Sequence, residues 1–247
     1  MQILESLFLG VLQGLTEWLP ISSSGHLVIT QEYLNIQAPL FFDILLHLAT
    51  ILVILIFFRK EILQIFKEFP NYKSSHGKLG WYIIIATIPI ALVGYLFNNQ
   101  ISSLFTNTKA VGISLLITGL LLILTKFSQG KKEISLKDSI IIGLSQALAI
   151  IPGISRSGAT ISTGLLLGLD KKQLITFSFL LVIPAIIGAT ILEFNPSSFE
   201  ITYIYGFIAS FIIGYITLKL LTILIEKNYF HYFAYYCWLI GILLLIY

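Results

Sequence analysis

Residues 13–27 read Gln13-Gly-Leu-Thr-Glu-Trp-Leu-Pro-Ile-Ser-Ser-Ser-Gly-His-Leu27, and residues 152–160 read Pro152-Gly-Ile-Ser-Arg-Ser-Gly-Ala-Thr160. Each polar run interrupts an apolar segment, which extends over 2–34 in the first case and over 138–169 in the second. Proline and glycine break helices, and clustered serines favour turns and helix caps. Both segments are therefore predicted to consist of two helices joined by a polar tip.

The composition of the whole chain places it in a membrane. Of its 247 residues, 57% are hydrophobic and 11% are charged, whereas a soluble domain carries about 25% charged residues. So few charges cannot cover a surface that faces water, but a surface that faces lipid needs almost none. The net charge of +3 is spread over short loops, so the sequence does not predict binding to nucleic acid.

Six further stretches are long enough to cross a bilayer, which takes about 20 apolar residues. They are 40–58, 80–98, 110–126, 174–192, 201–221 and 232–247. Together with the two interrupted segments they predict one polytopic, all-α membrane domain over 1–247.

Loop charge predicts the orientation of this domain. Basic residues gather in the loops 59–78 and 126–137, at Lys171 and Lys172, and at Lys219 and Lys227. The loops 98–109 and 193–200 contain one basic residue between them, Lys109. By the positive-inside rule the first group is cytoplasmic and the second is outside. Segment 138–169 must then begin and end on the cytoplasmic side, and segment 2–34 is expected to do the same on the outer side, as re-entrant hairpins.

The two hairpins also resemble each other in sequence. A shift of 133 residues gives seven identities within 16 positions. They are Gly10/Gly143, Gln13/Gln146, Leu15/Leu148, Ile21/Ile154, Ser22/Ser155, Ser24/Ser157 and Gly25/Gly158. We expect an inverted-topology repeat with halves 1–128 and 134–247, an architecture that places its site at the repeat interface near the bilayer midplane.

The first tip carries side chains suited to acid–base and nucleophilic chemistry. Gln13 and Glu17 are four residues apart and share a helix face, and a carboxylate at membrane depth is costly unless it is paired or functional. Ser22 to Gly25 would cap the second half-helix, where free amides and the helix dipole favour an anion. One of the serines is a candidate nucleophile, and His26 is a candidate base or acid.

The second tip repeats this cap and adds a cation. The guanidinium of Arg156 matches phosphate oxygens, and Thr160 lies one helical turn beyond it. If the tips meet, acid, hydroxyl, imidazole and guanidinium converge on one anionic group, which favours phosphoryl chemistry. The alternative is a purely structural Glu17–Arg156 pair. Asp43 and His47, near the outer end of the first full span, are expected to have a solvated or capping role.

These motifs resemble those of a known family. Gln13-Gly-Leu-Thr-Glu17 with Leu-Pro-Ile-Ser-Ser-Ser-Gly-His26 is similar to the first signature of the undecaprenyl-diphosphatases, also called bacitracin-resistance proteins, and residues 152–160 resemble the second. The resemblance covers nearly the whole chain. It implies a phosphatase in the bacterial cell membrane, with its site open to the outer face. It also implies hydrolysis of undecaprenyl diphosphate to undecaprenyl phosphate, the lipid carrier of cell-wall precursors, with Mg²⁺ or Ca²⁺ as cofactor.

The resemblance also assigns roles by position. Gln13 and Glu17 match a (Glu/Gln)-x-x-x-Glu pattern and are the candidate metal ligands, although glutamine weakens position 13 as a charged ligand. Ser23 matches the proposed nucleophile. The candidate catalytic residues are thus Glu17, Ser23, His26 and Arg156. The candidate phosphate-binding residues are Ser22, Ser24, Gly25, Ser155, Ser157 and Thr160.

Several alternatives stay open at this point. Water could attack the phosphorus in place of serine, and Glu17 could hold a metal or act as a base. The expected partners are the diphosphate lipid and membrane lipids, and a homodimer is left open. The rival function is a lipid-phosphate transporter or flippase, because an inverted repeat with broken helices is also typical of transporters.

Overall fold

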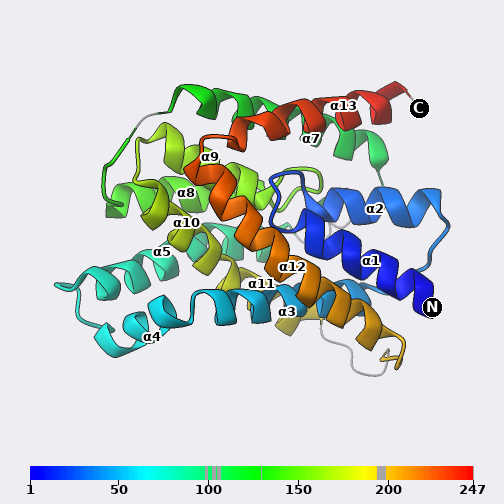
Figure 1. Ribbon diagram of the computed structural model, residues 1–247, viewed down its shortest axis with the longest axis horizontal. Helices are drawn as coiled ribbons and strands as arrows, with labels where there is room; N and C mark the ends of the chain where they lie inside the picture. The colour runs from blue at the N-terminus through cyan, green and yellow to red at the C-terminus, as the bar shows by residue number, and fades with distance from the viewer. Residues whose placement is uncertain (98–99, 102–103, 105–106, 129, 194–198, 247) are drawn as a thin grey trace.

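The computed structural model describes residues 1–97, 100–101, 104, 107–128, 130–193 and 199–246, and this part of the chain is built from helices (Figure 1). The helices are α1 Ile3–Thr16, α2 Ser23–Tyr33, α3 Leu40–Phe57, α4 Arg59–Glu68, α5 Ser75–Leu96, α7 Thr108–Leu124, α8 Leu136–Leu148, α9 Arg156–Leu166, α10 Lys171–Leu180, α11 Val182–Glu193, α12 Tyr203–Glu226 and α13 Phe233–Ile246. Short 3₁₀ turns, Thr125–Phe127 and Phe230–Tyr232, follow α7 and precede α13.

Five stretches among the described residues are long and apolar enough to cross a membrane. They are Leu40–Phe57, Ser75–Leu96, Thr108–Phe127, Lys171–Ile191 and Tyr203–Glu226. Five of the six predicted spans are confirmed in this sense, by length and composition. The sixth, predicted over 232–247, is a shorter apolar helix, Phe230–Ile246. The predicted outer loops 98–109 and 193–200 lie partly outside the described residues.

Two elements differ from the sequence-based expectation. The span predicted over 174–192 is divided into α10 and α11 at Leu181. Pro184 lies in the first turn of α11, where its missing N–H is tolerated, while its ring prevents α10 from continuing past Leu180. The loop predicted over 59–78 contains helix α4, whose Leu63 and Phe66 are exposed.

The two interrupted segments form helix pairs that point toward each other. Figure 1 shows α1 and α2 entering from one end of the molecule and α8 and α9 from the other, with the two connecting tips meeting in the middle. The 14 residues of α1 extend about 21 Å and the 11 residues of α2 about 17 Å. Each arm is therefore shorter than the hydrocarbon core of about 30 Å.

The tips are held together by backbone groups. Gly153 N donates to Ser22 Oγ at 3.1 Å, and Ser157 Oγ donates to Trp18 O at 3.0 Å. Neighbouring helices support each tip. Thr118 of α7 donates to Gly153 O at 3.0 Å, and Cys237 of α13 contacts Pro20 O at 3.6 Å.

Gly153 offers a test of the backbone conformation of the second tip and of its packing against α7. Its φ is +92°, and a Cβ atom there would lie 2.5 Å from the carbonyl oxygen of Val111. We expect Gly153→Ala to lower the free energy of unfolding by about 1–3 kcal/mol, from backbone strain alone, measured by thermal unfolding in detergent. Gly188→Ala is the matched control, because nothing lies within 4 Å of its Cβ position. An unchanged melting temperature for Gly153→Ala would contradict this account.

Candidate functional site

The two tips share the hydrogen bonds of their helix caps. Ser22 caps α2 and accepts a hydrogen bond from Gly25 N at 3.3 Å, and Ser155 caps α9 and accepts one from Gly158 N at 3.1 Å. In each tip the capping hydroxyl also contacts the serine two residues on, at 3.3 Å for Ser22 and 3.2 Å for Ser155. The serine–glycine pattern noted in the sequence therefore corresponds to one set of cap hydrogen bonds, although the backbone differs, with φ of +69° at Ser22 and −72° at Ser155.

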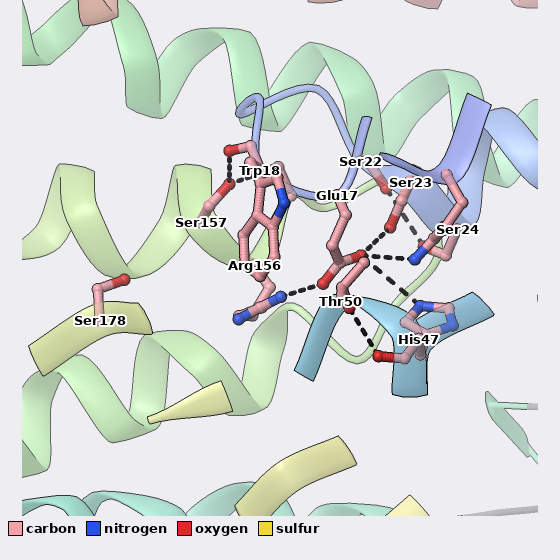
Figure 2. A network of polar contacts seen from close by, with 12 residues as sticks. Glu17, Trp18, Ser22, Ser23, Ser24, His47, Thr50, Arg156, Ser157 and Ser178 are labelled. Atoms are coloured by element: carbon pink, nitrogen blue, oxygen red, sulfur yellow. Dashed lines mark hydrogen bonds and ion pairs between the residues drawn. The ribbon is translucent and has the colours of Figure 1, made fainter. Parts of the chain in front are cut away.

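Glu17 is the centre of the polar contacts between the tips (Figure 2). Its side chain is 4% exposed. One carboxylate oxygen, Oε1, pairs with Arg156 Nη2. The other, Oε2, accepts hydrogen bonds from Ser23 Oγ at 2.6 Å and from Gln13 Nε2 at 3.1 Å. The predicted convergence of Glu17, Ser23 and Arg156 is present in the structure.

Arg156 keeps one donor group free beside this pair. Its Nη1 is buried and has no hydrogen-bond partner among the described residues. A buried donor without a partner carries a desolvation penalty of about 1–3 kcal/mol, more when it is charged. The fork geometry of guanidinium lets it hold Glu17 with one nitrogen and the oxygen of a bound anion with the other.

A cavity of about 340 Å³ opens next to these groups. Its polar lining comprises Glu17, Ser22, Ser23, Ser24, Gln31, Asp43, His47, Ser155, Arg156 and Thr190. Much of the remaining wall is aliphatic, with Leu27, Val28, Leu40, Ile44, Ile90, Ile150, Ile154, Val182 and Ile186. The cavity thus offers a polar cluster within an apolar wall, which suits an anionic group attached to a hydrocarbon chain.

Two residues of this cavity were assigned differently from the sequence. Asp43 and His47 of α3 line the cavity, so the expected solvated or capping role is corrected. His47 Nε2 lies 3.6 Å from Glu17 Oε2, and Gln31 Nε2 donates to the Asp43 carboxylate at 3.0 and 3.3 Å. A carboxylate and an imidazole one turn apart in an apolar span were the signal that could have identified them.

His26 lies elsewhere, and the prediction that it joins Arg156 in one site is corrected. Its Nε2 is 2.8 Å from the hydroxyl of Tyr236 on α13, and its Nδ1 is 2.8 Å from Ser22 O. The imidazole also stacks on the Tyr236 ring. Both ring nitrogens are occupied, and His26 lines a different, largely apolar cavity between α1, α12 and α13.

The hydroxyls of two residues that were predicted to bind phosphate, Ser157 and Thr160, contact protein groups outside the cavity. Ser157 Oγ donates to Trp18 O at 3.0 Å. Thr160 Oγ1 donates to Arg156 O at 2.9 Å and contacts Ser178 Oγ at 2.6 Å. Neither hydroxyl lines the Glu17 cavity. In the structure these hydroxyls make packing and orienting contacts, and their predicted phosphate contacts stay a prediction.

Gly25 has a packing role in the structure, and its predicted phosphate contact stays a prediction. It does not line the cavity, and a Cβ atom on it would lie 3.1 Å from Val111 and 3.2 Å from Gly153. The absence of a side chain at this position is what lets the two tips approach so closely.

Gln13 and Glu17 do not fit a metal held by the protein alone. Gln13 Oε1 is buried and has no hydrogen-bond partner among the described residues, as a metal-ligand oxygen could be. Its Nε2, however, donates a hydrogen bond to Glu17 Oε2. Both Glu17 oxygens already accept from protein donors. Within the described ranges, no group of three or more His, Cys, Asp or Glu could hold a metal ion.

Comparisons with known proteins agree on one family. The family model described as bacitracin resistance protein BacA matches residues 6–243. A relative from Methanobrevibacter smithii named undecaprenyl-diphosphatase is 42% identical over 271 aligned residues, covering 98% of this chain and 96% of the relative. One of the same name from Korarchaeum cryptofilum is 42% identical, covering 99% of each chain. Undecaprenyl-diphosphatase 2 from Bacillus thuringiensis is 41% identical, covering 99% of this chain and 97% of the relative.

Proposed function

Because this chain belongs to the bacitracin resistance protein BacA family, we infer that it is an undecaprenyl-diphosphatase. It is a hydrolase that converts undecaprenyl diphosphate to undecaprenyl phosphate and phosphate. Its product is the lipid carrier for cell-wall precursors, which connects the activity to cell-wall synthesis and to bacitracin resistance. The observation that supports the site of this reaction best is that Glu17 accepts a hydrogen bond from Ser23 and pairs with Arg156, whose buried Nη1 has no partner among the described residues.

We place the substrate with its terminal phosphate at the polar cluster. Arg156 Nη1 and the Ser22 and Ser24 hydroxyls, which line the cavity, are donors for the phosphate oxygens. The prenyl chain leaves along the aliphatic wall formed by α2, α3, α5 and α11. Apolar burial of the chain supplies affinity, while the polar groups fix the position of the reacting phosphorus.

The proposed first step uses two residues of the first tip. Ser23 Oγ attacks the terminal phosphorus, and its proton passes to Glu17 Oε2, which already accepts its hydrogen bond at 2.6 Å. The bond between the terminal phosphorus and the bridging oxygen breaks, and undecaprenyl phosphate leaves. Arg156 stabilises the charge that spreads over the transferred phosphoryl group. Direct attack by water, with Glu17 as its base, is the competing mechanism.

A divalent cation stays a proposal for this reaction. Since Gln13 and Glu17 do not fit a metal held by the protein alone, we propose that Mg²⁺ or Ca²⁺ enters bound to the diphosphate of the substrate. Such a cation would also offset the repulsion between the diphosphate and the carboxylate of Asp43 in the same cavity.

The membrane arrangement is proposed on the loop charges and helix lengths. We propose that the chain lies in the cell membrane as an inverted-topology repeat with halves 1–128 and 134–247. In this arrangement α1–α2 and α8–α9 are re-entrant hairpins. The Glu17 cavity, lined by Gln31 of α2 and by Leu40 and Asp43 in the first turns of α3, then faces the outer leaflet. A homodimer stays a prediction.

The alternative function, a lipid-phosphate transporter, is less well supported than the phosphatase. Binding and release of a lipid phosphate need Arg156, but they do not need a hydroxyl bonded at 2.6 Å to a buried carboxylate. Such a pair is what a nucleophile and its base require. The names of the relatives, which are those of an enzyme, point the same way.

Two substitutions test the assigned roles through phosphate release from undecaprenyl diphosphate by the purified protein in detergent. We expect Arg156→Lys to lower kcat by about 10²–10³-fold, because lysine keeps the charge but cannot hold Glu17 and a phosphate oxygen together. We expect Ser23→Ala to abolish turnover. Ser145→Ala is the control, because this hydroxyl bonds Ile142 O in its own helix and should leave the rate unchanged.

Either variant could contradict the mechanism. Full activity in Ser23→Ala would remove serine as the nucleophile and favour attack by water. An unchanged rate in Arg156→Lys would show that this guanidinium does not clamp the phosphate. Absence of phosphate release from well-folded wild type would sink the phosphatase assignment itself.

The cation proposal predicts where a metal binds. We expect chelator to abolish phosphate release, and Mn²⁺ added to the lipid-free protein to keep the electron paramagnetic resonance signal of the free ion. Addition of a non-hydrolysable prenyl methylenebisphosphonate should then immobilise the ion. Stoichiometric binding without lipid, lost in Glu17→Gln, would restore Glu17 as the ligand of a resident metal.

A further inference from the structure

His47 is held in one orientation inside the Glu17 cavity (Figure 2). Its Nδ1 lies 2.7 Å from the backbone carbonyl oxygen of Asp43. A carbonyl can only accept a hydrogen bond, so Nδ1 carries the hydrogen. In the neutral ring Nε2 is therefore the basic nitrogen, and it is on the side of Glu17, with 3.6 Å between Nε2 and Glu17 Oε2.

Glu17 and His47 differ in what they can reach. Glu17 is 4% exposed, and its oxygens are occupied by Arg156 and Ser23. His47 is 27% exposed and lines the cavity with its basic nitrogen unclaimed by a hydrogen bond. Glu17 can take the proton of Ser23, whereas His47 offers the more exposed side chain to a water molecule that enters the cavity.

We propose that His47 is a catalytic residue of the second half of the reaction, the hydrolysis of phosphorylated Ser23. This inference rests on the proposed function and on attack by Ser23. The oxygen of a cavity water attacks the phosphorus and its proton passes to His47 Nε2. The bond between phosphorus and Ser23 Oγ breaks, and Oγ takes back the proton that Glu17 received in the first step. Inorganic phosphate leaves, and His47 returns its proton to water.

The position of Glu17 favours this assignment, in which Glu17 accepts the proton of Ser23 and His47 accepts the proton of water. Once His47 is protonated, its imidazolium is 3.6 Å from a carboxylate that has just given up its proton to Ser23. Opposite charges at this separation stabilise each other in a low-dielectric site. His26 cannot take this part, because its ring nitrogens are bonded to Tyr236 and Ser22 and it lines the other cavity.

The test separates the two products in time. Wild type, His47→Gln and His47→Asn are mixed with excess undecaprenyl diphosphate and quenched, and undecaprenyl phosphate, inorganic phosphate and phosphorylated Ser23 are measured. Asparagine can still donate to Asp43 O but has no basic nitrogen. We expect both variants to release one equivalent of undecaprenyl phosphate in a burst and to accumulate phosphorylated Ser23. Their release of inorganic phosphate should be at least about 100-fold slower than in wild type.

Further arms exclude a merely structural role. Free imidazole in the buffer should restore phosphate release in a third variant, His47→Ala, which leaves room for the ring. His231→Gln, which changes a histidine outside both cavities, should behave as wild type. Equal slowing of both products without a burst, or an unchanged rate, would overturn the role of His47. Failure of wild type to release either product would instead count against the proposed function.

Discussion

Glu17 and Arg156 carry opposite charges in the apolar interior of this molecule, and they come from hairpins 139 residues apart in the chain. Separating such a pair leaves a buried charge without its partner, which typically costs about 3–5 kcal/mol. The fold must therefore bring the two tips together. Gly25 permits the close approach, because a Cβ atom on it would lie 3.2 Å from Gly153 of the other tip, and Gly153 lets its tip pack against Val111 of α7. Ser22 then bonds Gly153 across the junction, so the capping residue of one hairpin also fixes the other.

The resemblance between the hairpins extends to their caps but not to their chemistry. Under the shift of 133 residues, Glu17 corresponds to Ile150 and Ser23 corresponds to Arg156. One tip thus carries the carboxylate and the hydroxyl, and the other carries the guanidinium. Each tip supplies a serine-capped helix end, and only their combination brings together the proposed base, nucleophile and phosphate clamp. This asymmetry is easier to reconcile with a reaction at one site than with equivalent binding states on two sides of a membrane.

Sequence reasoning reached the parts of the structure that depend on local patterns. Proline, glycine and serine marked the breaks between α1 and α2 and between α8 and α9, and hydropathy located five spans. The Glu17–Arg156 contact followed from the cost of isolated charges in lipid. The predicted positions of His26 and His47 differ from the structure, because these positions depend on residues distant in the sequence. The His26 ring lies outside the Glu17 cavity, where it forms a hydrogen bond with Tyr236, 210 residues later in the chain. His47 lines the cavity because of the way α3 packs against its neighbouring helices. The hydrophobic periodicity of residues 40–58 does not predict that packing.

Gln13 shows how one amide changes the electrostatics of the site. Its Nε2 donates to Glu17 Oε2 at 3.1 Å. A glutamate at this position, which the family pattern also allows, would place a second carboxylate against the first in a low-dielectric environment. One of the two would then need a proton or a cation. The glutamine removes that need, and together with Arg156 and Ser23 it satisfies Glu17 with protein donors alone. This set of donors supports the proposed role of the carboxylate as a base for Ser23.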